Sequence, residues 1–177
     1  MITDLFPGRF RQVAYVTNDF DRALSNVTET TGVRHFLQLR DYEYIAGPGA
    51  IVRCHIAMAL AGGVEIEIIE PRGGAQEIYR DRLAGAEFGL HFHHVAYGLP
   101  SLEVLTDLKA RISAQGAPIA LEGVAPEGLT YFYADLRASL GHYVEYVYGT
   151  PAYEAAMAAA LAPSSAPLPQ HHHFRRN

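Results

Sequence analysis

A repeated strand limits most strongly what this chain can fold into. The segment Phe10–Tyr15 reads FRQVAY, and the segment Phe92–Tyr97 reads FHHVAY. Both alternate apolar and polar side chains, as expected of a strand that is buried on one face. Gln12 and His94 occupy the same position in the two copies, and each is followed two residues later by an alanine. This self-similarity predicts two related modules whose first strands correspond.

The same order of elements follows each copy of this strand. A helical pattern comes next, over residues 20–30 in the first half and 101–115 in the second. Apolar residues recur there at helical spacing behind a capping residue. Three strand-like runs separated by Gly and Pro then follow in each half. The order β-α-β-β-β therefore occurs twice, which predicts an α+β fold.

We expect four parts along the chain. They are module 1 over residues 1–71, a linker with a short helix over 72–90, module 2 over 91–150, and a helix with a mobile tail over 151–177. The last helix is expected from its alanine content, and the tail is rich in Pro and Ser, which is typical of a segment without a packed core.

Composition and charge narrow the classes of function. The chain has 177 residues, 49% hydrophobic and 19% charged, as globular proteins do. Its formal net charge is −5 and no basic stripe occurs, which argues against nucleic acid as a partner. The single Cys54 cannot form an internal disulfide. No apolar run is long enough to span a membrane and the start lacks the pattern of a secretion signal, so we expect a cytoplasmic protein.

Two of the later strands carry glutamates among large apolar residues. The run VEIEIIEP contains Glu65 and Glu67, and the run GHYVEYVYG contains Glu145. Burying an isolated carboxylate costs several kcal/mol, so it requires a cation, a proton or a metal. The interval from Gln12 to Glu67 is similar to the interval from His94 to Glu145. The two halves therefore predict one shared polar site.

Three further side chains are candidates for binding a substrate. Tyr133 lies on a strand rich in tyrosine. Arg137 follows that strand and can hold a carboxylate with two hydrogen bonds, or it is a surface arginine paired with a nearby acid. His55 lies on a strand in the first half and can enter the cavity as an acid or base, or it is a core histidine with satisfied hydrogen bonds.

The paired β-α-β-β-β halves resemble the vicinal oxygen chelate superfamily, which includes glyoxalase I, methylmalonyl-CoA epimerase, extradiol dioxygenases and bleomycin-resistance proteins. The resemblance covers about residues 10–149. It implies an open, curled mixed β-sheet cradle in which the first and last strands of both halves supply the ligands of one divalent metal. By position, these implied ligands are Gln12, Glu67, His94 and Glu145. The motif IEIIEP selects Glu67, and the motif GHYVEYV selects Glu145.

The ligand set and the strand motifs resemble different branches of the superfamily. The set Gln-Glu-His-Glu resembles that of glyoxalase I, whereas the strand endings resemble methylmalonyl-CoA epimerase and uncharacterised bacterial members. The epimerase pattern has His where Gln12 stands and Gln where Glu67 stands, and the extradiol pattern has two His and one Glu. Three oxygen ligands and one imidazole leave Zn, Ni, Co, Mn and Mg all open as the ion.

The resemblance implies a metal-dependent isomerase, epimerase or lyase that acts on a small carbonyl substrate with two adjacent oxygens. Glu145 is then the base that removes the proton next to the carbonyl, with Glu67 opposite it, and the metal stabilises the resulting enolate. Two alternatives stay open, a non-catalytic small-molecule binder of the bleomycin-resistance type and a ring-cleaving extradiol dioxygenase. The expected partners are a small-molecule substrate and a second copy in a homodimer, with neither nucleic acid nor membrane.

Overall fold

The computed structural model describes residues 7–162, apart from residues 48, 84 and 86. The tail expected after residue 162 lies outside the described residues. The first half contains β1 (Arg9–Thr17), α1 (Phe20–Thr31), β2 (Leu37–Ala46), β3 (Ala50–Ala61) and β4 (Val64–Gly74). The short α2 (Glu77–Arg80) follows it. The second half contains β5 (Leu90–Gly98), α3 (Leu102–Ala114), β6 (Ile119–Ala125), β7 (Leu129–Asp135), α4 (Arg137–Leu140) and β8 (Tyr143–Gly149), before the final α5 (Pro151–Leu161).

The two long helices begin where the sequence places a cap. Asp19 accepts a hydrogen bond from the backbone N–H of Arg22 at the start of α1. Ser101 does the same for Val104 at the start of α3. Each cap satisfies a backbone donor that the first turn would otherwise leave free. No helix among the described residues is long and apolar enough to cross a membrane.

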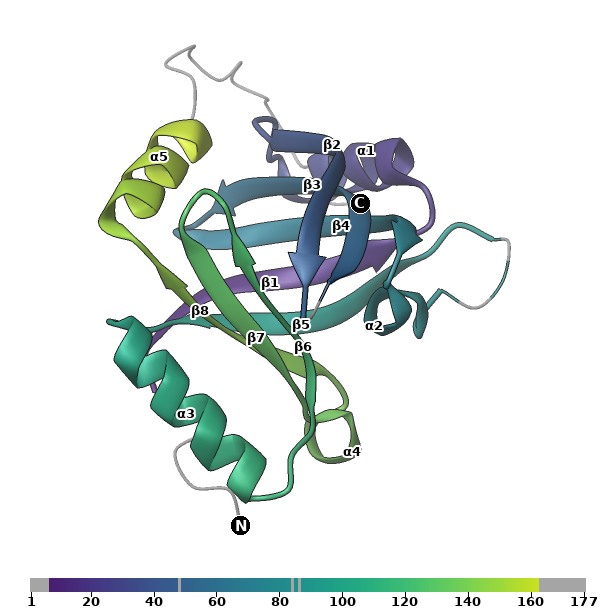
Figure 1. The fold of residues 1–177 in the computed structure, drawn as a ribbon. Helices are drawn as coiled ribbons and strands as arrows, with labels where there is room; N and C mark the ends of the chain where they lie inside the picture. Colours follow the sequence, from purple (N-terminus) through teal and green to yellow (C-terminus); the bar gives the residue numbers. More distant parts are fainter. Residues whose placement is uncertain (1–6, 48, 84, 86, 163–177) are drawn as a thin grey trace, which may run out of the picture.

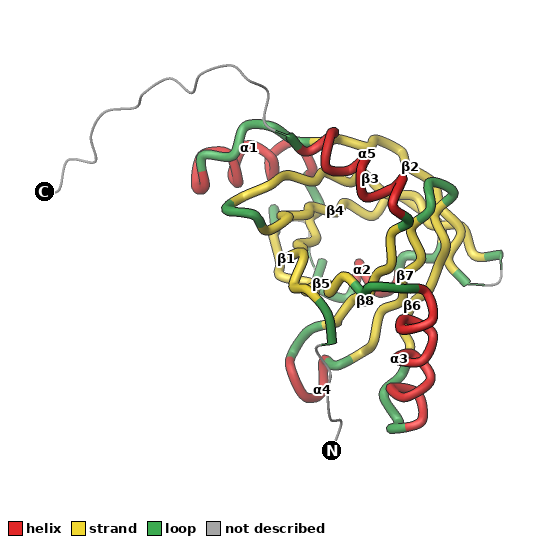
Figure 2. The backbone as a smooth tube through the Cα atoms, turned by 90° about the vertical axis from the view of Figure 1, so that its left-hand side faces the viewer, coloured by secondary structure: helices red, strands yellow, loops and turns green. Residues whose placement is uncertain are grey.

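The strands form one closed barrel in the order β1-β4-β3-β2-β6-β7-β8-β5 (Figures 1 and 2). The first strands of the two halves, β1 and β5, are antiparallel neighbours. Each of them also pairs in parallel with the last strand of its own half, β1 with β4 and β5 with β8. The strands β4, β1, β5 and β8 are therefore contiguous, and they bring together the four strands that carry the implied ligands.

The expectation of an open cradle was wrong, because β2 and β6 close the sheet. They meet at the pair Ala46 and Gly123, and the backbone N–H of Gly47 donates to the carbonyl oxygen of Glu122 at 2.8 Å. A Cβ on Gly123 would overlap the hydroxyl of Tyr131 and lie 2.9 Å from a backbone oxygen of β2. The closure therefore depends on a glycine that lets two backbones approach, which a local turn signal does not predict.

Helices cover the outer faces of both half-sheets and leave the inner faces to a cavity. On the first half, α1 packs against β3 and β4 through apolar residues that include Phe20, Val27 and Ile68. On the second half, α3 packs against β7 and β8, with Leu108 and Phe132 in that cluster (Figure 1). Burying these apolar faces supplies the main stabilisation of each module.

Candidate metal and substrate site

Two alanines organise the polar side chains of the four contiguous strands. Ala14 on β1 pairs with Glu67 on β4 and with His94 on β5. Directly paired residues on neighbouring strands point to the same face of the sheet. Glu67 and His94 therefore flank Ala14, which is fully buried.

Ala96 on β5 has the corresponding place in the second half. It pairs with Gln12 on β1 and with Glu145 on β8. Because β1 and β5 run antiparallel, the alanine of one copy of the repeat lies opposite the polar residue of the other copy. A methyl group between two long polar side chains leaves them room to approach each other, which explains the alanine in both copies.

The structure brings the four implied ligands close together. His94 Nε2 lies 3.3 Å from Glu145 Oε2 and 3.6 Å from Glu67 Oε2. The Gln12 side chain hydrogen-bonds to Glu67. Both nitrogen–oxygen separations exceed the usual hydrogen-bond length of about 2.9 Å. They are close to the roughly 3.4 Å that separates two ligand atoms around a tetrahedral ion with bonds of about 2.1 Å.

A chain of hydrogen bonds defines which nitrogen of His94 carries a proton. His93 Nε2 lies 2.9 Å from the carbonyl oxygen of Ile78, which can only accept, so His93 donates there. Burial and the neighbouring His94 lower the pKa of His93 to about 3, so His93 is neutral and its Nδ1 accepts. His94 Nδ1 must then donate across the 2.8 Å that separates the two Nδ1 atoms. In its neutral form, His94 consequently presents a lone pair at Nε2, towards the carboxylates.

Two of these atoms lack a hydrogen bond. His94 Nε2 and Glu67 Oε2 are buried and have no hydrogen-bond partner among the described residues. Burial, Glu145 and Glu65 raise the pKa of the Glu67 carboxyl well above its usual value. Among the described residues, no three His, Cys, Asp or Glu side chains form a closed ion-binding group as they stand. The fit to a divalent ion rests instead on these two atoms without hydrogen bonds. Both carry lone pairs, and one bound ion would accept a lone pair from each of them.

The neighbouring glutamates of β4 have arginine partners. Glu65 lies 3.1 Å from Arg11 Nε, and Glu70 lies 2.9 Å from Arg72 Nη1. Glu67 is the carboxylate between them, and among the described residues its Oε2 has no hydrogen-bond partner. This difference in partners distinguishes Glu67 from the two adjacent acids.

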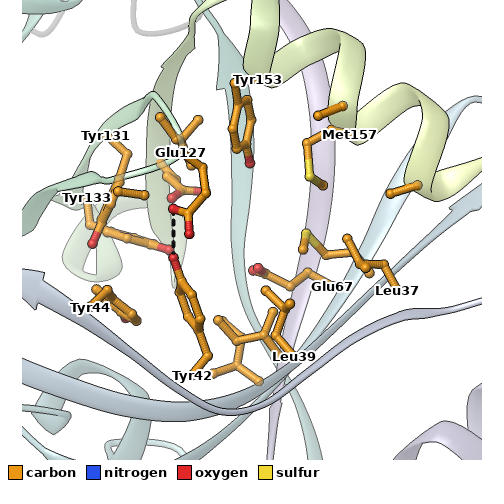
Figure 3. Close-up of a pocket in the computed structure, with 18 of the residues that line it drawn as sticks. Leu37, Leu39, Tyr42, Tyr44, Glu67, Glu127, Tyr131, Tyr133, Tyr153 and Met157 are labelled. Carbon is orange, nitrogen blue, oxygen red and sulfur yellow. Dashed lines mark hydrogen bonds between the residues drawn. The ribbon is translucent and has the colours of Figure 1, made fainter.

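A cavity of about 390 Å³ opens beside these side chains (Figure 3). Glu67 and Glu145 line it, and Glu127 is the other acid in its wall. Aliphatic residues of β2, β3 and β4 form one side. The aromatic lining consists of Tyr42, Tyr44, Tyr79, Tyr131, Tyr133 and Tyr153. A largely apolar pocket with a few convergent polar groups is the usual form of a small-molecule site.

Comparison with known families places the chain in one superfamily. The sequence profile of the Glyoxalase/Bleomycin resistance protein/Dioxygenase superfamily matches residues 11–134. The chain belongs to this superfamily. The search of curated proteins found no match.

Solved structures of similar fold include methylmalonyl-CoA epimerases and a hypothetical protein. The epimerase of Mycobacterium tuberculosis has a TM-score of 0.55 at 16% identity, over 88% of this chain and 96% of that one. The epimerase of Streptomyces coelicolor in complex with 2-nitronate-propionyl-CoA has a TM-score of 0.53 at 16% identity, over 81% and 98%. A hypothetical protein of Bacillus halodurans has a TM-score of 0.52 at 16% identity, over 80% and 94%. At these identities the likeness concerns the fold.

The sequence predicted three substrate-binding residues in this chain. One of them, Tyr133, lines the cavity. Its ring centroid lies 4.9 Å from that of His94, at nearly a right angle. His55 does not lie among the described lining residues. Its neighbours Ile56 and Met58 do, and His55 packs instead against the Phe20 ring of α1 at 5.3 Å. The structure therefore corrects the expectation that His55 enters the cavity.

Arg137 is also outside the described lining of the cavity. Its guanidinium pairs with Asp135 and Asp81 and lies 4.7 Å above the Tyr143 ring. These contacts match the alternative that Arg137 is a surface arginine paired with nearby acids, rather than a residue that holds a substrate carboxylate.

Sequence reasoning missed the part of the cavity that comes from α5. Tyr153, Ala156, Met157 and Ala160 line it, although the helix was expected from its alanine content alone. These positions recur at helical spacing on one face, so the pattern was readable. The sequence carries no local signal that this face covers a cavity built by the barrel.

Proposed function

We propose that this chain is a divalent-metal-dependent isomerase, epimerase or lyase that acts on a small carbonyl compound with two adjacent oxygens. The observation that carries the proposal is the pair of unsatisfied buried atoms, His94 Nε2 and Glu67 Oε2, beside an apolar cavity. Gln12, Glu67, His94 and Glu145 would hold the ion. Three oxygen donors and one imidazole nitrogen suit Zn, Ni, Co, Mn or Mg.

The acids of the site have complementary positions for proton transfer. A bound divalent ion supplies Lewis-acid stabilisation of negative charge on a substrate oxygen, worth several kcal/mol. Glu145 lines the cavity from β8 and takes the proton from the carbon next to the carbonyl. Glu67 lines the cavity from β4, across the β1 and β5 pair, and can return a proton from that side. The apolar wall excludes water and strengthens these interactions.

The epimerase structures support the isomerase branch of the proposal. The Streptomyces coelicolor epimerase of similar fold was solved with 2-nitronate-propionyl-CoA. Its superfamily pattern differs from the ligand set here at Gln12 and Glu67, so we do not extend its substrate to this chain. The Gln-Glu-His-Glu set favours a glyoxalase-like isomerase or lyase over ring cleavage, which uses two His and one Glu.

A second candidate is a protein that binds a small molecule without turning it over. The tyrosine-rich and aliphatic lining of the cavity favours it, because such a wall can hold an apolar molecule without an ion. Metal content separates the two candidates, since the binder does not require an ion.

Metal analysis of protein purified without chelators tests the proposal. We expect about one divalent ion per chain in the wild type and strong loss of occupancy in Glu67→Ala, which removes the ligand oxygen. Glu70→Ala is the matched control, because Glu70 pairs with Arg72 on the same strand. Exchange of the proton next to the carbonyl in D₂O, followed by NMR for a panel of 2-hydroxyketones, then reports turnover. Glu145→Gln that folds, retains the ion and keeps full exchange would exclude Glu145 as the base. Failure of all five ions to bind would overturn the proposal.

A further inference from the structure

The helix α5 forms one wall of the cavity rather than an appendage of the barrel. It follows β8 after a single residue and contacts β3 and β8. Tyr153 and Met157 point from it into the cavity, towards the side where Glu67 lies (Figure 3). Ala156 and Ala160 complete this wall. The view in Figure 2 shows α5 on the rim of the barrel.

An ion pair from a buried arginine holds the beginning of α5. Arg11 Nη1 lies 2.6 Å from Glu154 Oε1, and Arg11 also pairs with Glu65 on β4. The guanidinium lies 5.9 Å from the centre of the Tyr153 ring. Arg11 is only 6% exposed, and its partner Glu154 on α5 is half-buried. Thr150 caps the helix by accepting from the backbone N–H of Tyr153 at 3.2 Å.

The other end of α5 is also fixed. His35 Nε2 lies 2.9 Å from the carbonyl oxygen of Ala160, and Leu161 is buried. At the start of the helix, a Cβ on Gly149 would overlap the Glu154 carboxylate and lie 2.7 Å from the Tyr153 ring. A glycine at this position therefore lets the helix fold back over the cavity. With both ends held, α5 is a fixed wall.

The charged side chains in the described lining of the cavity are all acids. Among the described residues that line it, the charged side chains are Glu67, Glu127 and Glu145, and none is a Lys, Arg or His. Glu127 accepts a hydrogen bond from the Tyr42 hydroxyl at 3.0 Å. Burial and this hydrogen bond raise the pKa of Tyr42 to about 12, so the phenol stays neutral. A phosphate or carboxylate on the part of a ligand facing α5 would find no cation.

We propose that α5 makes the cavity select a compound whose two adjacent oxygens are joined to an uncharged aromatic body. The two adjacent oxygens of this compound are inferred from the proposed function. Its aromatic body is inferred from the wall formed by Tyr153, Ala156 and Met157. The cavity volume of about 390 Å³ equals that of about a dozen water molecules at roughly 30 Å³ each. This volume holds one or two fused rings beside the chelating group. Tyrosine faces and edges are good partners for such rings.

Titration calorimetry with hydroxamates tests this selection, because a hydroxamate presents two adjacent oxygens. The full chain, loaded with Zn²⁺, is titrated with acetohydroxamate, benzohydroxamate, 2-naphthohydroxamate and 4-carboxybenzohydroxamate. Burying a ring against the wall is expected to strengthen binding by about 50-fold from acetohydroxamate to 2-naphthohydroxamate. The added carboxylate should remove most of the gain of benzohydroxamate. Equal affinity for all four compounds would overturn the inference.

A substitution in the wall locates the effect on α5. Ala156→Trp places a large side chain in the cavity. It should reduce the ratio of the affinities for 2-naphthohydroxamate and acetohydroxamate by at least about tenfold, with the affinity for acetohydroxamate unchanged. Ala158→Trp is the matched control, because Ala156 and Ala158 are both exposed positions of α5 but Ala158 lies outside the described lining. If Ala158→Trp reduces this affinity ratio as much as Ala156→Trp does, the inference that α5 selects aromatic ligands is refuted.

A neutral probe separates failure of this inference from failure of the proposed function. N-phenyl-1-naphthylamine has no chelating group, and its fluorescence reports entry into an apolar cavity. Binding of this probe to the wild type but not to Ala156→Trp supports the wall even if no hydroxamate binds, and in that case the metal-dependent function fails alone. Binding of acetohydroxamate that requires Zn²⁺, without any gain from aromatic groups, supports the metal site and refutes the wall.

Discussion

Arg11 and His93 depart from the alternation of their strands, and each makes a contact that borders the candidate site. In the ladder between β1 and β5, the pairing passes from Phe10 to Gln12 and, at the other end, from His94 to Phe92. Arg11 and His93 are thus the extra residues of two bulges, at the same position of the repeat. The first bulge turns Arg11 towards the acids that fix α5, and the second turns His93 towards His94.

Loss of the His93 hydrogen bond should weaken metal binding. His93→Phe keeps a ring among the neighbouring tyrosines but cannot accept from His94 Nδ1. We expect metal affinity to fall about 10- to 100-fold, because the partner of a ligating histidine sets its orientation and tautomer. Competition with a chromogenic chelator measures the change. His142→Phe, a half-buried histidine without contact to His94 among the described interactions, is the control. Unchanged affinity in His93→Phe would contradict the hydrogen-bond chain.

The metal-free protein should lose stability as the pH rises, through Glu67. The folded state holds the pKa of Glu67 well above its unfolded value near 4.5, by burial and by Glu145 and Glu65. The folded state therefore binds the extra proton, and its contribution is complete below pH 4.5 and is lost as the pH rises through the folded pKa. Urea denaturation in the presence of a chelator, from pH 5 to 8, should show a flatter dependence for Glu67→Gln than for wild type. Parallel curves would contradict this prediction.

At the scale of elements, the barrel closes through one narrow contact. The central strands pair over many residues, whereas β2 and β6 meet at Ala46 and Gly123. The Tyr131 hydroxyl fills the space beside Gly123 and has no hydrogen-bond partner among the described residues. Closure places Tyr42, Tyr44 and Tyr131 around one cavity, so the seam determines the shape of the substrate wall as well as the fold.

A methyl group at this seam should destabilise the protein. In Gly123→Ala, the new Cβ would overlap the Tyr131 hydroxyl and crowd a backbone oxygen of β2. We expect the free energy of unfolding to fall by about 1–3 kcal/mol, as for other overpacked sites. Urea denaturation measures the change. Gly73→Ala is the matched control, since a Cβ there meets nothing within 4 Å and Gly73 lies in β4. A loss of equal size in both variants would show that the seam is not the cause.

At the scale of the whole molecule, two copies of one unit form a single site. The pairs of Ala14 and Ala96 with their neighbours relate the halves by an approximate twofold symmetry, and each half supplies two of the implied ligands. Neither half alone contains the set. Two departures from symmetry, α2 between the halves and α5 after them, contribute Tyr79 and Tyr153 to the lining of the cavity.

The homodimer stays a prediction of the sequence resemblance. Large apolar residues are exposed near the seam, with Ile45, Ile51 and Val124 each more than half exposed. Such a patch favours self-association. Light scattering after size exclusion should give twice the mass of one chain, and Val124→Lys should lower it to that of a single chain. A monomeric wild type at micromolar concentration would refute the prediction.

The sequence alone predicted the repeated order of elements, because that order is recorded locally by strand alternation and helix spacing. The family resemblance implied Gln12, Glu67, His94 and Glu145 as ligands, and their role as ligands stays a prediction. The sequence did not predict barrel closure at Gly123, the turn of Arg11 and His93 at the bulges, or α5 as a wall. His55 illustrates the limit, because alternation placed it on one face of β3 but could not tell whether α1 or the cavity lies against that face. Each of these depends on contacts between segments far apart in the chain, which only the packed tertiary structure decides.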